Sequence, residues 1–273
     1  MKRSKWRLFL TKNLAGFTNM AIDEVLLLES GKRKSNYEGN LRFYTWKNPT
    51  ISLGYFQKAE DVIDVKRCKN LGISLVRRIT GGGAIYHNAE ITYSITTFLP
   101  NPVVSSNIEL SYKVLESFLI KGISELGVNV NFRNEVEKDN SSFYCFANPS
   151  KYDIVFNDKK LIGSAQRRSK KCFLQHGSIL LNLNDTDKMF SVFKDNKDKA
   201  ISEFKESTTT LEDLLKKKIN INEVIDVFIK KFEEEFNVDL VLNEFTNSEK
   251  KLIKELEKKY INVTEGKDET NIN

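Results

Sequence analysis

The chain has 273 residues, of which 40% are hydrophobic and 29% charged, a composition typical of a soluble globular protein with a substantial core. No apolar run approaches the ~20 residues of a membrane span, and the basic start MKRSKWRLFL lacks the long apolar stretch of a signal peptide, so we expect a cytoplasmic protein with no membrane partner. The net charge of +6 suits an acidic protein partner, whereas the dispersed basic residues and the lack of a recognised motif argue against nucleic acid.

Hydrophobic periodicity and turn residues predict the elements of the first half of the chain. In chain order they are a strand at 6–11, a helix from Phe17 to about Ser30 capped by Thr18 or Asn19, a strand at 41–46, a helix at 59–70, strands in ISLVRRI and AIYHNAEITYSITTF, and a helix at 107–127 stopped by Gly127.

The second half begins with β-type segments and then becomes helical. Its predicted elements are a strand at 128–132, a loop at 134–142, strands at 152–156 and 160–164 joined by an Asn157-Asp158 turn, a strand at 173–183, and helices at 211–217, 222–236 and 248–259. No linker or internal repeat divides the chain, and the strands do not alternate regularly with helices. We therefore expect an α+β fold with a mixed or antiparallel sheet flanked by helices, in which residues 1–245 form the catalytic domain and 246–273 a C-terminal helix and tail of the same unit.

The first segment with a chemical signature is RRITGGGAIYH, residues 77–87. Three consecutive glycines, Gly81, Gly82 and Gly83, permit backbone conformations and close approaches that side chains forbid. Such a loop can present backbone N–H groups to an anion, with Arg77 and Arg78 as nearby cations. The simpler alternative is a glycine-rich hairpin corner with solvated arginines, because the motif matches neither a Walker A loop nor a dinucleotide fingerprint.

The second segment runs from Cys145 to Ser178 and contains YCFANPSKYDI, KKLIGSAQRR and FLQHGSILLN. A free cysteine is more often a small core residue than a nucleophile, and Lys160, taken alone, is best interpreted as a solvated charge at a strand edge. The three cysteines of the chain are too scattered for a disulfide framework or a zinc site.

The chain has only two histidines, His87 and His176, and each lies in one of these two segments. Without a nearby cysteine or carboxylate cluster they make a poor metal site, so we predict no metal. Either histidine can act as an acid or base or simply hold a loop. Asp23 and Asp153 are candidate buried acids, with capping or turn roles as the alternative.

Taken together, these segments resemble the biotin/lipoate protein ligase and octanoyltransferase superfamily, whose fold is that of class II aminoacyl-tRNA synthetases. The matching stretches lie between residues 6 and 185 and are NMAIDEVLL, LRFYTWKNPTISLGYFQ, RRITGGGAIYH, GSAQRR and QHGSILLN. The combination of CFANPSKYDI and KLIGSAQ is most similar to the cysteine-dependent octanoyltransferases of Gram-positive bacteria. That resemblance implies Cys145 as the nucleophile and Lys160 as its partner.

The resemblance also implies a reaction. An octanoyl group would pass from octanoyl-acyl carrier protein to a thioester on Cys145, and then to a lysine of a lipoyl-domain protein such as glycine cleavage H protein, with no cofactor and with a monomeric enzyme. Arg78, the Gly81–Gly83 loop, His87, Gly163, Ser164 and His176 would bind the substrate. Three alternatives stay open: an ATP- and Mg-dependent lipoate–protein ligase acting through lipoyl-adenylate, a lipoyl-domain amidotransferase, and a binding protein without catalysis.

Overall fold

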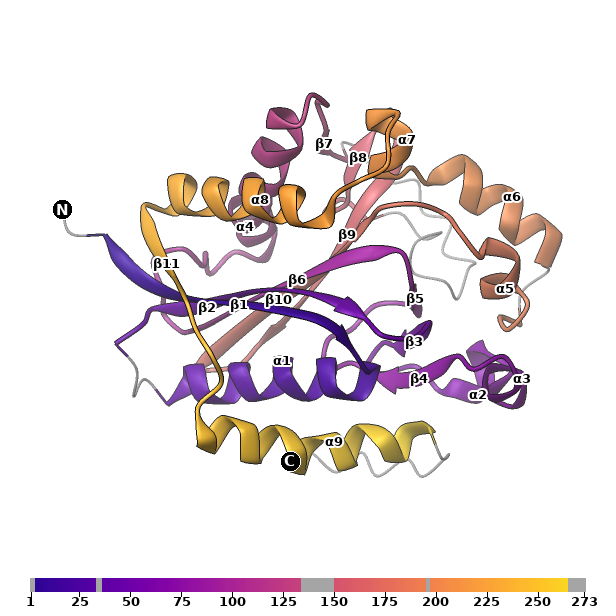
Figure 1. Ribbon diagram of the computed structural model, residues 1–273, viewed down its shortest axis with the longest axis horizontal. Helices are drawn as coiled ribbons and strands as arrows, with labels where there is room; N and C mark the ends of the chain where they lie inside the picture. The colour runs from indigo at the N-terminus through magenta and orange to yellow at the C-terminus, as the bar shows by residue number, and fades with distance from the viewer. Residues whose placement is uncertain (1–2, 33–35, 134–149, 195–196, 265–273) are drawn as a thin grey trace.

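A mixed eight-stranded sheet forms the centre of the computed structural model, which describes residues 3–32, 36–133, 150–194 and 197–264 (Figure 1). The strands, in spatial order, are β11 (Val238–Leu242), β1 (Ser4–Leu14), β2 (Gly39–Trp46), β6 (Glu90–Phe98), β10 (Cys172–Leu180), β9 (Lys159–Arg168), β8 (Ile154–Phe156) and β7 (Asn131–Phe132). β1 runs parallel to both of its neighbours, and the other pairs are antiparallel. The predicted mixed sheet is confirmed.

A second, three-stranded sheet lies beside the large one and carries the glycine loop. Its strands are β4 (Ser74–Arg77), β3 (Thr50–Leu53) and β5 (Ile85–His87), with β3 in the middle. The described helices are α1 (Gly16–Gly31), α2 (Ala59–Val62), α3 (Val65–Asn70), α4 (Ile108–Glu125), α5 (Thr186–Phe190), α6 (Lys197–Ser207), α7 (Leu211–Leu215), α8 (Ile221–Phe236) and α9 (Asn247–Thr264).

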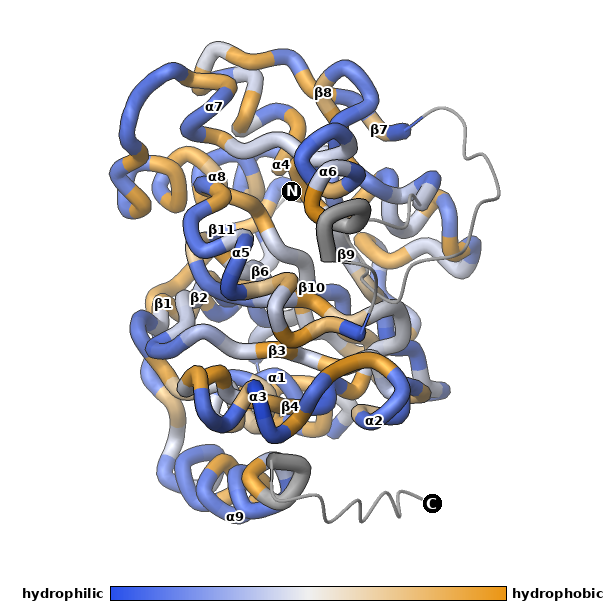
Figure 2. Tube along the Cα trace, turned by 90° about the vertical axis from the view of Figure 1, so that its right-hand side faces the viewer, coloured by the Kyte–Doolittle hydropathy of each residue, from blue (hydrophilic) through white to orange (hydrophobic). Residues whose placement is uncertain are grey.

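Helices cover both faces of the large sheet, and each face has its own apolar core. α4 and α8 cover one face, where Phe118, Phe228 and Phe232 pack against the strands. α1 covers the other face, and α9 packs outside α1 (Figure 1). A third core joins the small sheet to the short helices around it. Figure 2 shows the amphipathic pattern behind these layers as orange and blue patches that alternate along α8 and α9.

Several predicted boundaries are confirmed by their local chemistry. Asn107 caps α4 by accepting a hydrogen bond from the backbone N–H of Leu110, and Gly127 follows the helix with φ +102°. Asn157 and Asp158 both have positive φ, as the tight turn between β8 and β9 requires.

Other boundaries were predicted wrongly. The helix expected at 59–70 is two short helices, because Ile63 is extended and bridges Phe193, and the Asp64 side chain caps α3. α1 begins at Gly16, without a side-chain cap, and Asn19 instead lies buried inside the helix with its amide oxygen bonded to Arg42. The strand predicted at 128–132 is reduced to Asn131–Phe132.

β11 was not predicted at all, although it lies in the region expected to be helical. α9 is tied to α1 by Lys259 and Tyr260, whose side chains donate to Glu24 at 2.8 and 2.5 Å. The division of the chain at residue 245 stays a prediction. Within the described ranges, no helix is both long and apolar enough to cross a membrane.

Candidate active site

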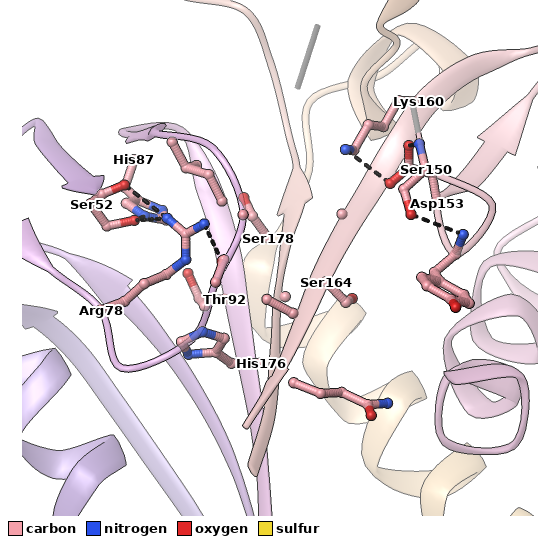
Figure 3. Close-up of a pocket in the computed structure, with 18 of the residues that line it drawn as sticks. Ser52, Arg78, His87, Thr92, Ser150, Asp153, Lys160, Ser164, His176 and Ser178 are labelled. Carbon is pink, nitrogen blue, oxygen red and sulfur yellow. Dashed lines mark hydrogen bonds and ion pairs between the residues drawn. The ribbon is translucent and has the colours of Figure 1, made fainter. Parts of the chain in front are cut away.

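A cavity of about 290 Å³ lies where the two sheets meet, close to the lower end of the ~300–1,000 Å³ range of ligand pockets (Figure 3). α1, β2 and β3 supply one part of its wall, and α4, β9 and β10 supply another. Its lining residues are Met20, Tyr44, Trp46, Ser52, Arg78, Gly81, Gly82, Ile85, His87, Thr92, Tyr112, Ser150, Tyr152, Asp153, Lys160, Gly163, Ser164, Ala165, Gln166, His176, Gly177 and Ser178.

Most of the residues singled out from the sequence converge on this cavity. Arg78, Gly81, Gly82, His87, Lys160, Gly163, Ser164 and His176 all line it. Gly83 is not among the lining residues. Cys145 lies outside the described residues, and Ser150, the first described residue after the stretch 134–149, is part of the cavity wall.

Lys160 is buried in the cavity wall rather than solvated at a strand edge, so that interpretation of the sequence was wrong. Its Nζ lies 2.9 Å from Oδ1 of Asp153, and both side chains are nearly inaccessible, at 2% and 3% exposure. The other carboxylate oxygen of Asp153 accepts a hydrogen bond of 2.8 Å from the backbone N–H of Ser150. Since an unpaired buried ammonium would cost several kcal/mol, Asp153 is what allows a charged Lys160 at this position.

Both arginines before the glycine loop are buried and bonded to backbone carbonyls, so the alternative of solvated arginines was also wrong. Arg77 Nη1 donates to the carbonyls of Gly54, Tyr55 and Gln57. Arg78 donates through Nη2 to the carbonyls of Gly81 and Gly83, at 2.8 and 2.7 Å. Arg78 therefore holds the glycine loop and Arg77 holds the turn after β3, and the substrate-binding role predicted for Arg78 stays a prediction.

The middle glycine of the loop is required by geometry. Gly82 has φ +94°, and a Cβ placed on Gly54 would lie 1.8 Å from the carbonyl oxygen of Gly82. The turn after β3 and the glycine loop are thus in backbone-to-backbone contact, as the close approach expected from the sequence demands. By contrast, a Cβ on Gly81 would meet no heavy atom within 4 Å.

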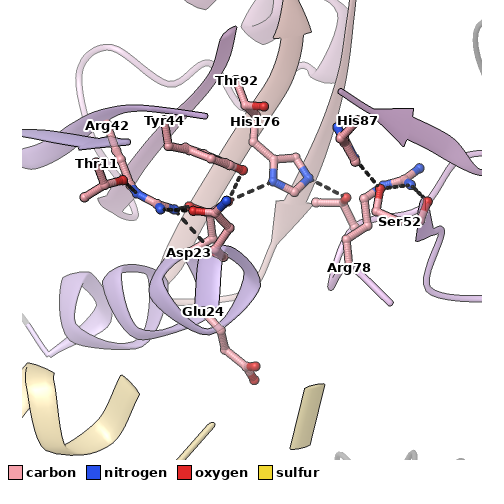
Figure 4. A network of polar contacts seen from close by, with 12 residues as sticks. Thr11, Asp23, Glu24, Arg42, Tyr44, Ser52, Arg78, His87, Thr92 and His176 are labelled. Carbon is pink, nitrogen blue, oxygen red and sulfur yellow. Dashed lines mark hydrogen bonds and ion pairs between the residues drawn. The ribbon is translucent and has the colours of Figure 1, made fainter. Parts of the chain in front are cut away.

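His176 connects the glycine loop to α1 (Figure 4). Its Nδ1 lies 3.1 Å from Oδ2 of Asp23, and its Nε2 lies 2.7 Å from the hydroxyl of Thr80. Burial lowers the pKa of His176, so the ring is neutral at neutral pH and the Thr80 hydroxyl donates to it. Burial acts to raise the pKa of Asp23, but the charge of Arg42, 2.8 Å away, and the hydrogen bond from His176 hold it below its usual value.

His87 lies in a second hydrogen-bonded chain, which runs from Ser52 through His87 to Glu90. Ser52 Oγ lies 2.7 Å from its Nε2, and Glu90 Oε1 lies 2.8 Å from its Nδ1. Arg78 Nη1 donates to Ser52 Oγ, 3.2 Å away, and the carboxylate of Glu90 accepts from His87 Nδ1.

Glu90 is the buried acid that orients His87. Burial acts to raise the pKa of Glu90, but His87 beside it and hydrogen bonds from Ser178 and Thr92 hold the pKa below its ordinary value. Trp46 stacks on the His87 ring, with centroids 4.0 Å apart, and its Nε1 also donates to Glu90. The ring is therefore held in one orientation.

Glu116 lies behind the cavity wall, near Ser164. Its Oε1 accepts a hydrogen bond of 3.0 Å from Gln175, and Tyr93, whose hydroxyl lies 2.8 Å from Ser164 Oγ, approaches it at 3.4 Å. Burial raises the pKa of Glu116 well above its usual value, which favours the protonated form of this carboxyl.

Sequence reasoning missed Ser52, Glu90, Thr92, Glu116 and Ser178. The sequence held one signal, the alternation of polar and apolar residues in EITYSIT of β6. Glu90, Thr92 and Ser94 lie on one side of this strand, whose residues are all buried or nearly so. Buried polar residues need hydrogen-bond partners, and Glu90 and Thr92 belong to the network around His87 beside the cavity.

The two cysteines within the described residues do not reach the cavity. Cys68 is buried in the core of the small sheet, and burial raises its pKa to about 11. Cys172 is half-buried, and its Sγ lies 3.1 Å from the Ser169 hydroxyl. Within the part of the chain that the structure describes, no cluster of three or more histidine, cysteine, aspartate or glutamate residues could hold a metal ion.

The sequence and this fold define a lipoate-ligase-type catalytic domain. The chain belongs to the family of the lipoyl protein ligase A/B catalytic domain, whose model matches residues 15–233. Two relatives named octanoyltransferase LipM, from Clostridioides difficile and Moorella thermoacetica, are each 38% identical to it over 95% of this chain and 97% of their own length. These matches confirm the family predicted from the sequence motifs.

The fold is shared with a solved structure. The bipartite lipoate protein ligase of Thermoplasma acidophilum, studied with its E2 lipoyl domain, superimposes with a TM-score of 0.78 at 24% identity, over 95% of this chain and 94% of that one. The predicted α+β fold class is confirmed.

Proposed function

We propose that this protein is an octanoyltransferase that takes an octanoyl group from octanoyl-acyl carrier protein, holds it as a thioester on Cys145, and passes it to a lysine of a lipoyl domain. The observation that carries the proposal is the buried pair of Lys160 and Asp153 in the wall of a ligand-sized cavity. The names of the full-length relatives support the octanoyl chemistry. We propose further that the enzyme acts as a monomer and without ATP.

In the first half-reaction the Cys145 thiolate attacks the carbonyl of the donor thioester. A new C–S bond forms to Cys145, the bond to the carrier sulfur breaks, and the carrier leaves as a thiolate that takes up a proton. An unperturbed cysteine has a pKa of about 8.5, so only a few per cent is thiolate at neutral pH. A positive charge fixed at Lys160 would favour the thiolate and stabilise the oxyanion that forms during attack.

In the second half-reaction the amine of the acceptor lysine attacks the Cys145 thioester. The amine must first lose the proton that it carries in water, where its pKa is about 10.4. The amide bond forms, the bond to Cys145 breaks, and the second proton that the amine loses goes to the leaving sulfur, directly or through Lys160, while the first has passed to solvent. No adenylate is needed, because the thioester already holds the acyl group in an activated form.

The acyl chain supplies binding free energy in this scheme. Burying about six methylenes at ~0.8 kcal/mol each gives on the order of 5 kcal/mol. Met20, Tyr44, Trp46 and Ile85 contribute apolar surface to the cavity wall, against which the chain can pack.

The test is to incubate the protein with octanoyl-acyl carrier protein, without ATP, and to find the octanoyl adduct by mass spectrometry of peptides. We expect the adduct on Cys145, its loss in Cys145→Ala, and its retention in the matched control Cys172→Ala. Normal turnover by Cys145→Ala would contradict the proposal. An absolute requirement for ATP with release of pyrophosphate would assign the chain to the lipoate ligases instead, and transfer only from an octanoylated lipoyl domain would assign it to the amidotransferases.

A further inference from the structure

Phe56 is the most exposed of the large hydrophobic side chains in the described part of the molecule. It is 86% exposed, compared with 68% for the next, Leu242. Single exposed apolar residues are common on protein surfaces and carry no meaning alone. Phe56 differs from such residues because of the backbone that holds it.

Hydrogen bonds hold the backbone of the turn that carries Phe56 in one conformation. The buried guanidinium of Arg77 donates to three carbonyls of this turn, those of Gly54, Tyr55 and Gln57. The Gly54 N–H donates to the side chain of Gln57 at 2.9 Å, and the Gln57 N–H donates back to the Gly54 carbonyl at 3.1 Å. The phenyl ring is thus presented to solvent on a preorganised backbone, which lowers the entropy lost when a partner binds it.

This turn adjoins residues that line the cavity, so it lies at the rim. The Tyr55 N–H donates to the Thr80 carbonyl at 2.9 Å, and Gly54 contacts the backbone of Gly82, which lines the cavity. On the opposite side, Arg167 from β9 lies over the Tyr55 ring at 5.2 Å and directly follows Gln166, another lining residue.

Two cations lie near the turn that carries the exposed ring, Lys58 in the sequence and Arg167 through its contact with Tyr55. Lys58 is exposed two positions after Phe56, and the guanidinium of Arg167 contacts Tyr55, whose ring meets that of Phe56 edge-on at 4.9 Å. An aromatic anchor with a cationic border fits a partner surface that has an apolar contact point and acidic residues around it.

We propose that Phe56, together with Tyr55, Lys58 and Arg167, is the docking surface for the protein domain that presents the acceptor lysine. This inference rests on the proposed function. A lysine has only a four-carbon stem, so a domain that delivers its amine to a thioester inside the cavity must press against the rim itself. A donor that carries its acyl group on a longer flexible arm has no such constraint, and we therefore assign this surface to the acceptor.

The experiment separates the two half-reactions. Phe56→Ala removes only exposed atoms, and we expect octanoylation of Cys145 by octanoyl-acyl carrier protein to proceed at the wild-type rate. With the preformed octanoyl-enzyme, we expect the KM for an unmodified lipoyl domain to rise at least tenfold, with little change in kcat. The matched control is Leu242→Ala, which removes an exposed apolar side chain on β11, at the far edge of the large sheet, and should change neither value (Figure 1).

The charged border is tested by Lys58→Glu. It should raise the KM for the lipoyl domain at low salt, and the effect should shrink as salt is added, because screening weakens exposed charge pairs. An unchanged KM in Phe56→Ala, or a loss of rate in the donor half-reaction instead, would overturn the assignment.

Binding measured by calorimetry makes this test independent of catalysis. The wild-type protein should bind the isolated unmodified lipoyl domain, and Phe56→Ala should bind it at least tenfold more weakly. If wild-type protein formed no Cys145 adduct, the proposed function would fail, yet the calorimetric comparison would still decide the docking surface. Equal binding by the two proteins would refute it.

Discussion

The raised pKa of the buried Glu116 carboxyl leads to a prediction about pH at the scale of one residue. Burial raises the pKa of this group in the folded protein, whereas a glutamate in the unfolded chain titrates near ~4.3. Its contribution to stability is therefore complete below pH ~4.3 and is lost as the pH rises toward the folded-state pKa. The Glu116→Gln variant does not lose this stability, because glutamine does not titrate. The difference in free energy of unfolding between the variant and the wild type should therefore increase with pH, by up to ~1.4 kcal/mol per pH unit.

The measurement is urea unfolding of both proteins at several pH values between about 5 and 8. Glu109→Gln, on the exposed side of the same helix, is the control, because hydrogen bonds from Lys151 and Lys113 lower the pKa of Glu109 and give no such rise. A difference between Glu116→Gln and wild type that stays constant with pH would mean that Glu116 is ionised in the folded protein.

Gly177 allows a second prediction for a single residue. A Cβ at this position would lie 2.4 Å from Ser164 Oγ and 2.5 Å from the Tyr93 ring. Gly177→Ala should therefore lower the free energy of unfolding by about 1–3 kcal/mol, the usual cost of overpacking. Gly81→Ala, whose Cβ meets nothing, should cost less than about 0.5 kcal/mol in the same denaturation assay. Equal costs for the two variants would contradict the geometry.

The sequence predicted most of the cavity residues but not their partners. Lys160, His87 and His176 were found because they lie in recognisable motifs, whereas Asp153 was only one of two candidate buried acids. The ion pair between Lys160 and Asp153 and the contact of Ser52 with His87 depend on how strands pair across the fold, which local patterns do not encode. Cys145 lies outside the described residues, so its meeting with Lys160 stays a prediction.

At the scale of elements, the contact between α4 and α8 depends on one glycine. A Cβ on Gly122 would lie 2.5 Å from the Phe228 ring. Gly122→Ala should cost about 1–3 kcal/mol, even though alanine is the better helix former. Phe228→Leu should reduce that cost, so that the double variant is more stable than the sum of the single effects by at least ~0.5 kcal/mol.

Thermal or urea unfolding of the four proteins in this cycle gives the coupling energy. Phe56→Leu is the control substitution. Phe56 is exposed and lies on the turn after β3, so it should show no coupling with Gly122→Ala. Strict additivity between Gly122→Ala and Phe228→Leu would mean that α4 and α8 move apart to fit the alanine methyl group, so that it does not clash with the Phe228 ring.

The long elements were predictable because their periodicity is strong, and the short ones were not. α4 and α8 were placed to within a few residues by their apolar spacing and, for α4, by the stop at Gly127. β11 is a short edge strand that exists because its backbone pairs with β1, a partner more than 200 positions away in the chain. The break at Ile63 likewise depends on pairing with Phe193, a distant segment that a local pattern cannot reveal.

At the scale of the whole molecule, the first strand and the last helix are joined by a buried ion pair. Arg7 on β1 donates to both carboxylate oxygens of Glu249 on α9, at 2.6 and 2.9 Å. Glu249→Gln leaves the guanidinium buried without its counter-charge, and we expect a loss of about 3 kcal/mol. If residues 246–273 belong to the same unit as residues 1–245, this loss will lower the midpoint of a single transition.

The check is unfolding followed both by helical circular dichroism and by tryptophan fluorescence, with Trp6 on β1 as one reporter. The two signals should change together in wild type and in Glu249→Gln. Glu244→Gln, at an exposed side chain, is the control and should leave the midpoint unchanged. Loss of helical signal before the fluorescence change would mean that the C-terminal segment unfolds by itself.

The contact between Gly54 and Gly82 limits how this scaffold can be altered. Because the two turns touch through their backbones, lengthening either by one residue would displace the other, and with it both the rim and the acyl cavity. An engineer who wished to move a new acceptor preference into a related enzyme would have to transplant both turns as one cassette. Libraries that vary them separately should yield mainly inactive proteins.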